Sequence, residues 1–264
     1  MYIKPYDELT IQDNFIFQKV MRNKRICKQT IERLLDIDIK DISYPEEEKS
    51  INVRLDSKSI RLDVYVNDDK GTVFNIEMQT TKDMDELVKR ARYYQGLIDI
   101  DNIEKGQNYS ALHDTYIIFI CTFGVFTGKR HKYTFRNLCI EDSEILLNDG
   151  TTKLFLSTKG EADDVSKPLK MFLDYVDGKK PEDALMQEID HEVYTVKHCD
   201  EWRRDYMTLA LEMDKKWREG KAEGKAEGKI EAIRNAIKDG LTTLADVKKS
   251  GRYTEEEIAA IAAP

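Results

Sequence analysis

The 264-residue sequence predicts an α/β protein in which helices flank a mixed sheet. Three observations favour this class. Residues 60–80 alternate apolar and polar side chains on both sides of a turn, as two paired strands do. Tyr116 to Phe123 is a nearly continuous apolar run, which is typical of a strand covered on both faces. Residues 13–36 and 83–101 carry apolar side chains at helical spacing. The predicted order is therefore helix, three strands, helix, strand.

The N-terminal elements follow from local patterns. We expect one helix over residues 13–36, then a short strand over residues 50–55 and a turn at residues 56–59. The hairpin begins at Ile60, and Asn67 to Gly71 form its turn because asparagine, aspartate and glycine favour tight turns. Each arm has a polar face and an apolar face, so we expect both strands to be half buried.

The next helix is expected over residues 83–101, with Thr80 or Thr81 as its cap. The apolar run from Tyr116 follows it, and residues 131–140 and 153–157 are further predicted strands. From Val165 onward the sequence favours helices, and the last of these is capped by Thr254 with Glu257 three residues later.

The hairpin collects acidic side chains on one face. A turn centred near residue 70 places Asp63 beside Glu77 on the neighbouring strand. Gln79 shares the face of Glu77, because side chains two positions apart on a strand point the same way. Two converging carboxylates are ligands that Mg²⁺ prefers, and the carbonyl of Met78 is a further candidate ligand. Without the surrounding motif, the same acids fit an ordinary solvated sheet face.

A tetrapeptide repeat marks residues 217–230, WREGKAEGKAEGKI. On a helix this period aligns Gly220, Gly224 and Gly228 in one stripe, although each glycine costs a helix about 1 kcal/mol relative to alanine. Close contact with another helix explains the repeat, and a flexible charged spacer is the alternative. We expect residues after about 200 to mediate self-association as a homo-oligomer through the C-terminal helices.

Charge and composition limit the function classes. The net charge of −8 argues against a simple electrostatic binder of nucleic acid, although two basic tracts could meet a phosphate backbone or form solvated faces. These tracts are Lys19, Arg22, Lys24, Arg25 and Lys28, and Lys129, Arg130, His131, Lys132 and Arg136. No apolar run reaches the roughly 20 residues of a membrane helix. With no signal-peptide pattern and four scattered cysteines, we expect a cytoplasmic protein without membrane partners.

The motifs RLDVYV, GTVFNIEMQT, KRARYYQ and TYIIFICTF together resemble the Rpn family of recombination-promoting nucleases, which are also described as transposases. This family belongs to the PD-(D/E)xK nuclease superfamily. The resemblance implies a restriction-endonuclease-like αβββαβ core, a mixed central sheet flanked by helices with a C-terminal helical tail. It predicts a nuclease-like domain over residues 1–160, a helical extension over 161–216, and a charged repeat helix with a terminal helical hairpin over 217–264.

The resemblance also implies site residues. Asp63 matches the metal-binding aspartate and Glu77 the (D/E) position, whereas Gln79 occupies the usual lysine position. Asp13 matches an acidic position of the first helix, and Arg90 a displaced basic residue on the helix after the motif. The implied activity is a DNA endonuclease that depends on Mg²⁺ or Mn²⁺, has low sequence specificity and is linked to recombination or mobile elements. The alternative is a weak or inactive nuclease fold that binds DNA or its own copies.

Overall fold

The computed structural model describes residues 2–44, 50–51 and 60–263 of the chain. It contains two compact units, one formed by residues 5–203 and the other by residues 204–264 together with residues 1–4. The helices are α1 (Asn14–Met21), α2 (Lys24–Leu35), α3 (Met84–Asn102), α4 (Lys167–Val176), α5 (Ala184–Lys197), α6 (Asp200–Lys238), α7 (Leu244–Lys249) and α8 (Glu255–Ala262), with short 3-10 turns at Tyr6–Glu8 and Tyr109–Ala111. The strands are β1 (Ile42–Ser43), β2 (Ser50–Ile51), β3 (Ile60–Arg61), β4 (Val64–Asp68), β5 (Val73–Gln79), β6 (Thr115–Cys121), β7 (Lys132–Phe135) and β8 (Thr151–Ser157).

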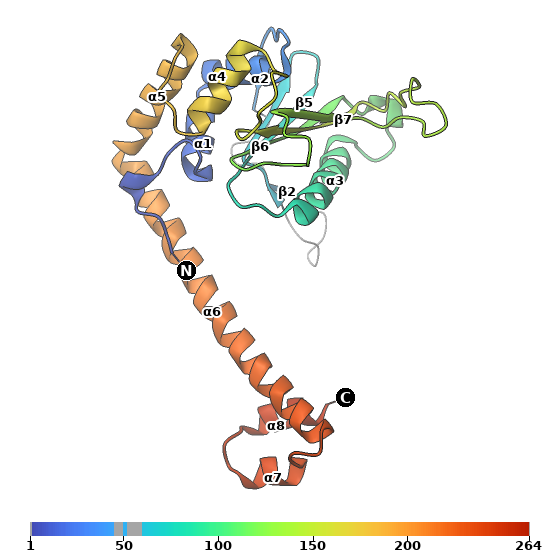
Figure 1. The fold of residues 1–264 in the computed structure, drawn as a ribbon, viewed down its shortest axis with the longest axis vertical. Helices are drawn as coiled ribbons and strands as arrows, with labels where there is room; N and C mark the ends of the chain where they lie inside the picture. Colours follow the sequence, from blue (N-terminus) through green and yellow to red (C-terminus); the bar gives the residue numbers. More distant parts are fainter. Residues whose placement is uncertain (1, 45–49, 52–59, 264) are drawn as a thin grey trace. The chain divides into compact units, whose positions relative to one another are not determined.

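A six-stranded mixed sheet forms the centre of the larger unit, in the order β1-β4-β5-β6-β8-β7. Strands β4 and β5 pair in antiparallel fashion, whereas β5, β6 and β8 run parallel to one another. Helix α3 lies on one side of the sheet, and α1, α2, α4 and α5 gather on the other (Figure 1). The predicted mixed α/β fold with flanking helices is confirmed.

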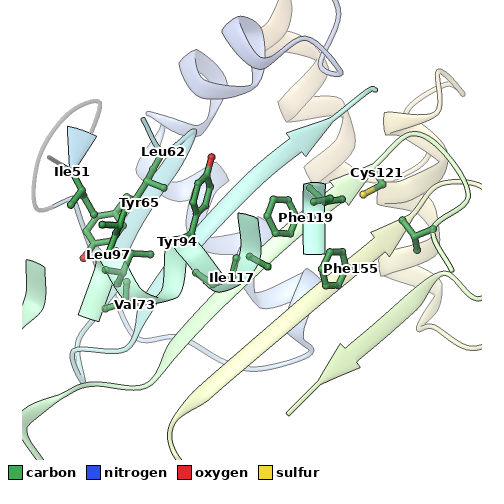
Figure 2. Close-up of a cluster of buried hydrophobic side chains, with 14 residues drawn as sticks. Ile51, Leu62, Tyr65, Val73, Tyr94, Leu97, Ile117, Phe119, Cys121 and Phe155 are labelled. Carbon is green, nitrogen blue, oxygen red and sulfur yellow. The ribbon is translucent and has the colours of Figure 1, made fainter. Parts of the chain in front are cut away.

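Helix α3 covers one face of the sheet through a cluster of buried side chains. Tyr94, Phe119 and Phe155 lie in this cluster (Figure 2). Alternating residues of β6 face α3, while those between them, such as Ile118 and Ile120, are buried on the opposite side. The apolar run of β6 is therefore covered on both faces, as its sequence predicts.

The hairpin strands are more deeply buried than their alternation suggests. The polar residues Asn75 and Glu77 are 0% and 3% exposed, and Tyr65 in the facing strand is 4% exposed. The expectation of half-buried strands was wrong, because α3 packs over the face that carries the polar side chains. Those side chains consequently lie in an environment from which water is largely excluded.

Several local boundaries differ from the sequence expectation, and the strand predicted over residues 131–140 is shortened to β7. The predicted helix over residues 13–36 is two helices, since the side chain of Asn23 caps α2 by accepting a hydrogen bond from the N–H of Ile26. Helix α3 is capped by Asp83, and the predicted caps Thr80 and Thr81 lie before it. The first hairpin arm is divided, because Ile60–Arg61 pairs with β2 instead of continuing into β4. The rest of the predicted strand over 50–55 and the turn at 56–59 lie outside the described residues.

The hairpin turn sets the register of the candidate site. Asp68 ends β4 and its carboxylate accepts hydrogen bonds from the N–H groups of Lys70 and Thr72. Gly71 follows with φ of +86°, a conformation that side chains with a Cβ rarely adopt. The resulting register pairs Val64 with Ile76. It consequently brings Asp63, one residue before β4, opposite Glu77.

We expect Gly71→Ala to destabilise the protein by about 1 to 3 kcal/mol, because φ becomes strained and the new Cβ meets the ring of His113 at 2.5 Å. The measurement is the urea midpoint. Gly96→Ala is the matched control, since beyond the adjacent helix backbone its Cβ meets no atom of the described residues within 4 Å, and alanine favours the interior of α3. If Gly71→Ala and the wild type had equal urea midpoints, the predicted backbone strain at residue 71 would be contradicted.

The helices after residue 165 fall into both compact units. Helices α4 and α5 belong to the unit of residues 5–203, and the domain boundaries at residues 160 and 216 stay predictions. The repeat lies within the 39-residue helix α6, which has no buried residue. The capping box formed by Thr254 and Glu257 at α8 is confirmed. Among the described helices, none combines the length and apolar character needed to cross a membrane.

Candidate metal centre

Asp63 and the strand that carries Glu77 are linked by reciprocal hydrogen bonds at the open end of the hairpin. The backbone N–H of Asp63 donates to Oε1 of Glu77 at 3.1 Å. The backbone N–H of Met78 donates to Oδ2 of Asp63 at 3.1 Å. Each carboxylate is thus fixed by the backbone of the other strand. The two acidic groups lie together, on adjacent segments, as the register requires.

Glu77 is held in a buried position beside a second acid. Burial and the negative charge of Asp63 raise the pKa of Glu77 well above its usual value. The N–H of Asp63, the positive charge of Arg90 and Asn75 oppose this rise. With its amide nitrogen turned toward the carboxylate, Asn75 donates to Oε1 of Glu77 and to the carbonyl of Val64, each at 3.2 Å. A buried carboxyl with a strongly shifted pKa is typical of a functional site.

Arg90 projects from α3 toward this pair of acids. Its guanidinium lies 5.5 Å from the ring centre of Phe119 and 5.8 Å from that of Tyr94. Its Nε and Nη2 atoms are buried and have no hydrogen-bond partner within the part of the chain that the structure describes. Buried donors without a hydrogen-bond partner cost free energy. The presence of two such donors on the positively charged side chain next to Glu77 therefore favours a role of Arg90 in binding a ligand.

Two amides of α1 also reach Asp63. Gln18 donates from Nε2 to Oδ1 of Asp63 at 2.8 Å, and Asn14 donates from Nδ2 to the same atom at 3.4 Å. Sequence reasoning missed both residues, because neutral amides leave no charge pattern and Gln18 lies 45 positions from Asp63. Their four-residue spacing on one helix face is the only signal that could have indicated them.

Asp13 lies immediately before α1. Its Oδ2 accepts hydrogen bonds from the backbone N–H of Thr10 at 2.7 Å and from the hydroxyl of Thr10 at 3.3 Å. The carboxylate is therefore engaged in organising the approach to α1. A direct role of Asp13 in the site stays a prediction.

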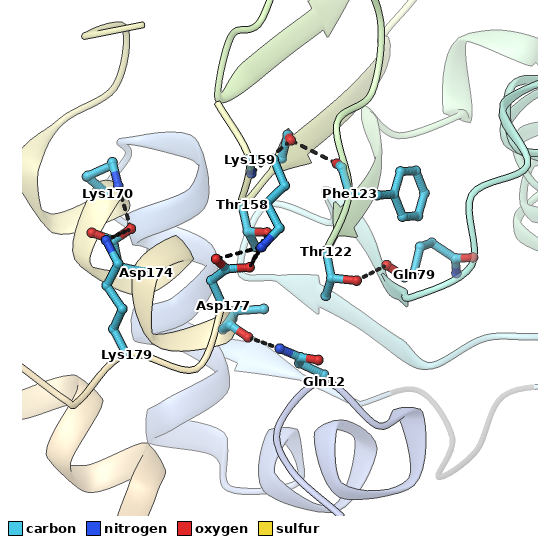
Figure 3. A network of polar contacts seen from close by, with 12 residues as sticks. Gln12, Gln79, Thr122, Phe123, Thr158, Lys159, Lys170, Asp174, Asp177 and Lys179 are labelled. Carbon is cyan, nitrogen blue, oxygen red and sulfur yellow. Dashed lines mark hydrogen bonds and ion pairs between the residues drawn. The ribbon is translucent and has the colours of Figure 1, made fainter. Parts of the chain in front are cut away.

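Gln79 ends β5 at the edge where the parallel strands finish. Its carbonyl accepts from the N–H of Thr122 at 3.0 Å and lies 3.5 Å from the Thr122 hydroxyl, next to a polar network that includes Lys159 and Asp177 (Figure 3). The side chain of Gln79 is half buried. An amide at this position can orient water or a ligand but supplies no positive charge.

The donor set fits one hard divalent cation. The part of the chain described by the structure contains no group of three His, Cys, Asp or Glu side chains that could hold a metal. Asp63 and Glu77 supply two carboxylates, so a third protein ligand has to come from the backbone. The N–H of Met78 points toward Asp63, and the carbonyl of a strand residue points to the same side as its N–H. The predicted set of Asp63, Glu77 and Met78 therefore matches the oxygen chemistry of Mg²⁺ or Mn²⁺.

Most charges of the two basic tracts are already paired. In the first tract, Lys24 pairs with Asp41, Arg25 with Glu188 and Lys28 with Glu32, and the ammonium group of the 5%-exposed Lys19 lies over the rings of Phe15 and Trp202. In the second tract, Lys129 pairs with Glu161, Arg130 and buried His131 contact Asp164, and Lys132 is half buried. These pairs reduce the positive potential that the sequence suggested.

Comparisons with known proteins indicate a family. Residues 14–159, more than half of the chain, match the model of the PD-(D/E)XK nuclease family transposases. The matched span contains the hairpin, α1 and α3, and with them every candidate site residue except Asp13. A search of curated proteins and a search of solved structures gave no match.

Proposed function

Since the chain belongs to the PD-(D/E)XK nuclease family transposases, we propose that it is a DNA endonuclease that depends on a divalent metal. It hydrolyses phosphodiester bonds with low sequence specificity and acts in the recombination or mobility of DNA in the cytoplasm. The reciprocal hydrogen bonds between Asp63 and the strand of Glu77 carry this proposal, because they bring two carboxylates together beside Arg90, whose buried Nε and Nη2 have no hydrogen-bond partner among the described residues.

Each residue of the site has a separate task. A bound Mg²⁺ or Mn²⁺ ion would lower the pKa of water and neutralise charge on the phosphate. Asp63, Glu77 and the carbonyl of Met78 would hold that ion. Gln79 orients water or a phosphate oxygen through its amide. Arg90 supplies the positive charge that a lysine at position 79 would otherwise give to the transition state.

The function is tested by plasmid cleavage. Purified protein should nick or linearise plasmid DNA in the presence of Mg²⁺ or Mn²⁺ and should be inactive in EDTA. Cleavage at many sequences would agree with low specificity. Cleavage that persists in EDTA would contradict the proposed metal dependence.

Arg90→Met should lower the single-turnover cleavage rate by about 100-fold, because it removes a preorganised positive donor beside the reacting phosphate. The variant should remain folded, since losing the positive charge beside Glu77 is offset by removing two buried donors that have no partner among the described residues. Arg92→Met on the exposed side of α3 is the matched control. If the Arg90 variant and the wild type cleaved DNA at equal rates, Arg90 would have no role in catalysis.

A second candidate is a weak nuclease fold that serves as an interaction module. The amide of Gln79 and the paired basic tracts favour it, because both reduce the charge available for catalysis and for DNA binding. A metal titration separates the two candidates, since an interaction module needs no ion at Asp63 and Glu77.

In either case we propose that α6 mediates self-association. Apart from the adjacent backbone of α6 itself, no atom of the described residues lies within 4 Å of a Cβ added at Gly220, Gly224 or Gly228, so this stripe is open to a second helix. Leucine at all three positions should block close approach and reduce the oligomer to a monomer in sedimentation velocity. Leucine favours helices more than glycine does, so melting of α6 would not explain the loss. Leucine at Ala222 and Ala226 is the control, and an unchanged mass for the triple variant would defeat the proposal.

A further inference from the structure

The carboxylate of Asp63 is fixed from two directions. On one side, the N–H of Met78 in β5 donates to Oδ2. On the other side, Gln18 and Asn14 donate to Oδ1. Rotation of the carboxylate about its Cβ–Cγ bond would break contacts on both sides. Its Oδ2 therefore stays turned toward β5, where Glu77 and Met78 lie.

Helix α1 is a rigid support for the two amides. Ile16, Phe17 and Val20 are fully buried on its other faces. The segment before α1 is anchored as well, because Nε2 of Gln12 donates to the carbonyl of Val176 at 2.6 Å (Figure 3). Asn14 and Gln18 lie four residues apart, one turn above the other on the same face. The amides are thus presented from a fixed position.

The chemistry of these donors suits an acid that has to bind a cation. An amide carries no net charge, so it orients Asp63 without cancelling the negative charge. A lysine or arginine pair would orient the same carboxylate but would neutralise it. Partners that orient a metal ligand typically contribute 10- to 100-fold in metal affinity or activity.

We propose that Gln18, with a smaller contribution from Asn14, is a positioning residue that orients Asp63 for divalent metal binding. This inference rests on the proposed metal-dependent function. The difference between the two contributions follows from the distances to Oδ1, 2.8 Å from half-buried Gln18 and 3.4 Å from exposed Asn14. If Gln18 only held α1 on the hairpin, its loss would lower stability and leave metal affinity unchanged.

The test is Mn²⁺ titration of the full chain, followed by the electron paramagnetic resonance signal of the free ion. Gln18→Met keeps the length of the side chain and removes the donor. It should weaken Mn²⁺ binding by about 10- to 100-fold, with an unchanged thermal midpoint in the metal-free protein. Asn14→Ala should cause a smaller loss. Gln29→Met, a half-buried glutamine of α2, is the matched control and should bind Mn²⁺ as the wild type does.

The outcomes separate this inference from the proposed function. Wild-type Mn²⁺ affinity in Gln18→Met would overturn the positioning role, while a wild type that binds Mn²⁺ and cleaves DNA would keep the function. A lower thermal midpoint without a change in affinity would likewise assign Gln18 to stability alone. A wild type that neither binds Mn²⁺ nor cleaves DNA would refute both.

Discussion

Replacing Asp63 with asparagine should reduce metal-dependent DNA cleavage by at least about 1,000-fold. A metal ion contributes several kcal/mol to transition-state stabilisation, and each 1.4 kcal/mol changes a rate about tenfold. Asparagine has nearly the same shape as aspartate but lacks the charge that holds the cation. It also places an NH₂ group against either the N–H of Met78 or the amide of Gln18, so one hydrogen bond is lost. The measurement is the initial rate of plasmid nicking at saturating Mg²⁺.

Asp69→Asn is the matched control for this prediction, because Asp69 is an exposed acid in the turn of the same hairpin. It should cleave DNA at the wild-type rate. Circular dichroism and the thermal midpoint of Asp63→Asn should show that the protein remains folded. A folded Asp63→Asn variant with more than a tenth of the wild-type activity would exclude Asp63 as a metal ligand.

Replacing Glu77 with glutamine should abolish cleavage and yet stabilise the metal-free protein at pH values above the raised pKa of Glu77. The pKa of Glu77 is raised by burial and by Asp63, so the folded chain binds a proton that the unfolded chain has released. This contribution to stability is complete below the ordinary carboxyl range, about pH 4.3, and is lost as the pH rises through the raised pKa. Glutamine cannot ionise, and its carbonyl can still accept the N–H of Asp63. Each unit by which folding raises the pKa of Glu77 corresponds to about 1.4 kcal/mol of stability that the wild type loses at high pH and the glutamine variant keeps.

Thermal unfolding in EDTA at a series of pH values measures this effect. The gain in midpoint of Glu77→Gln over the wild type should be near zero in acid and should grow to several degrees as the pH rises. Added Mg²⁺ should then stabilise the wild type but not the variant, because a ligand raises the stability of the state that binds it. A variant that is less stable than the wild type at every pH would show that Glu77 is a structural acid.

The sequence predicted those parts of the fold that depend on local periodicity. The apolar run of β6, the turn at Gly71 and the stripe of α3 all appear in the structure, because each follows from a pattern within a few residues. The register across the turn also followed, since the strand period and the turn position alone bring Asp63 opposite Glu77. The family resemblance carried by the same segments is confirmed.

Features that depend on distant contacts could not be predicted in this way. The burial of Asn75 and Glu77 depends on how α3 packs over the hairpin, and the alternation within β5 does not reveal that cover. Gln18 contacts Asp63 only because α1 is packed beside the sheet. The pairing of the basic tracts was unpredictable for the same reason, because acidic partners such as Glu188 and Asp164 come from segments far along the chain.

The central claim is that Asp63 and Glu77 form one divalent metal site, and Mn²⁺ binding measured by isothermal titration calorimetry tests it most directly. The wild type should bind Mn²⁺, and Mg²⁺ should compete for the same site. Asp63→Asn and Glu77→Gln should each lose this binding, while Asp69→Asn should retain it. A wild type that binds no Mn²⁺ at millimolar concentrations, or an Asp63→Asn/Glu77→Gln double variant that binds it as tightly as the wild type, would contradict the claim.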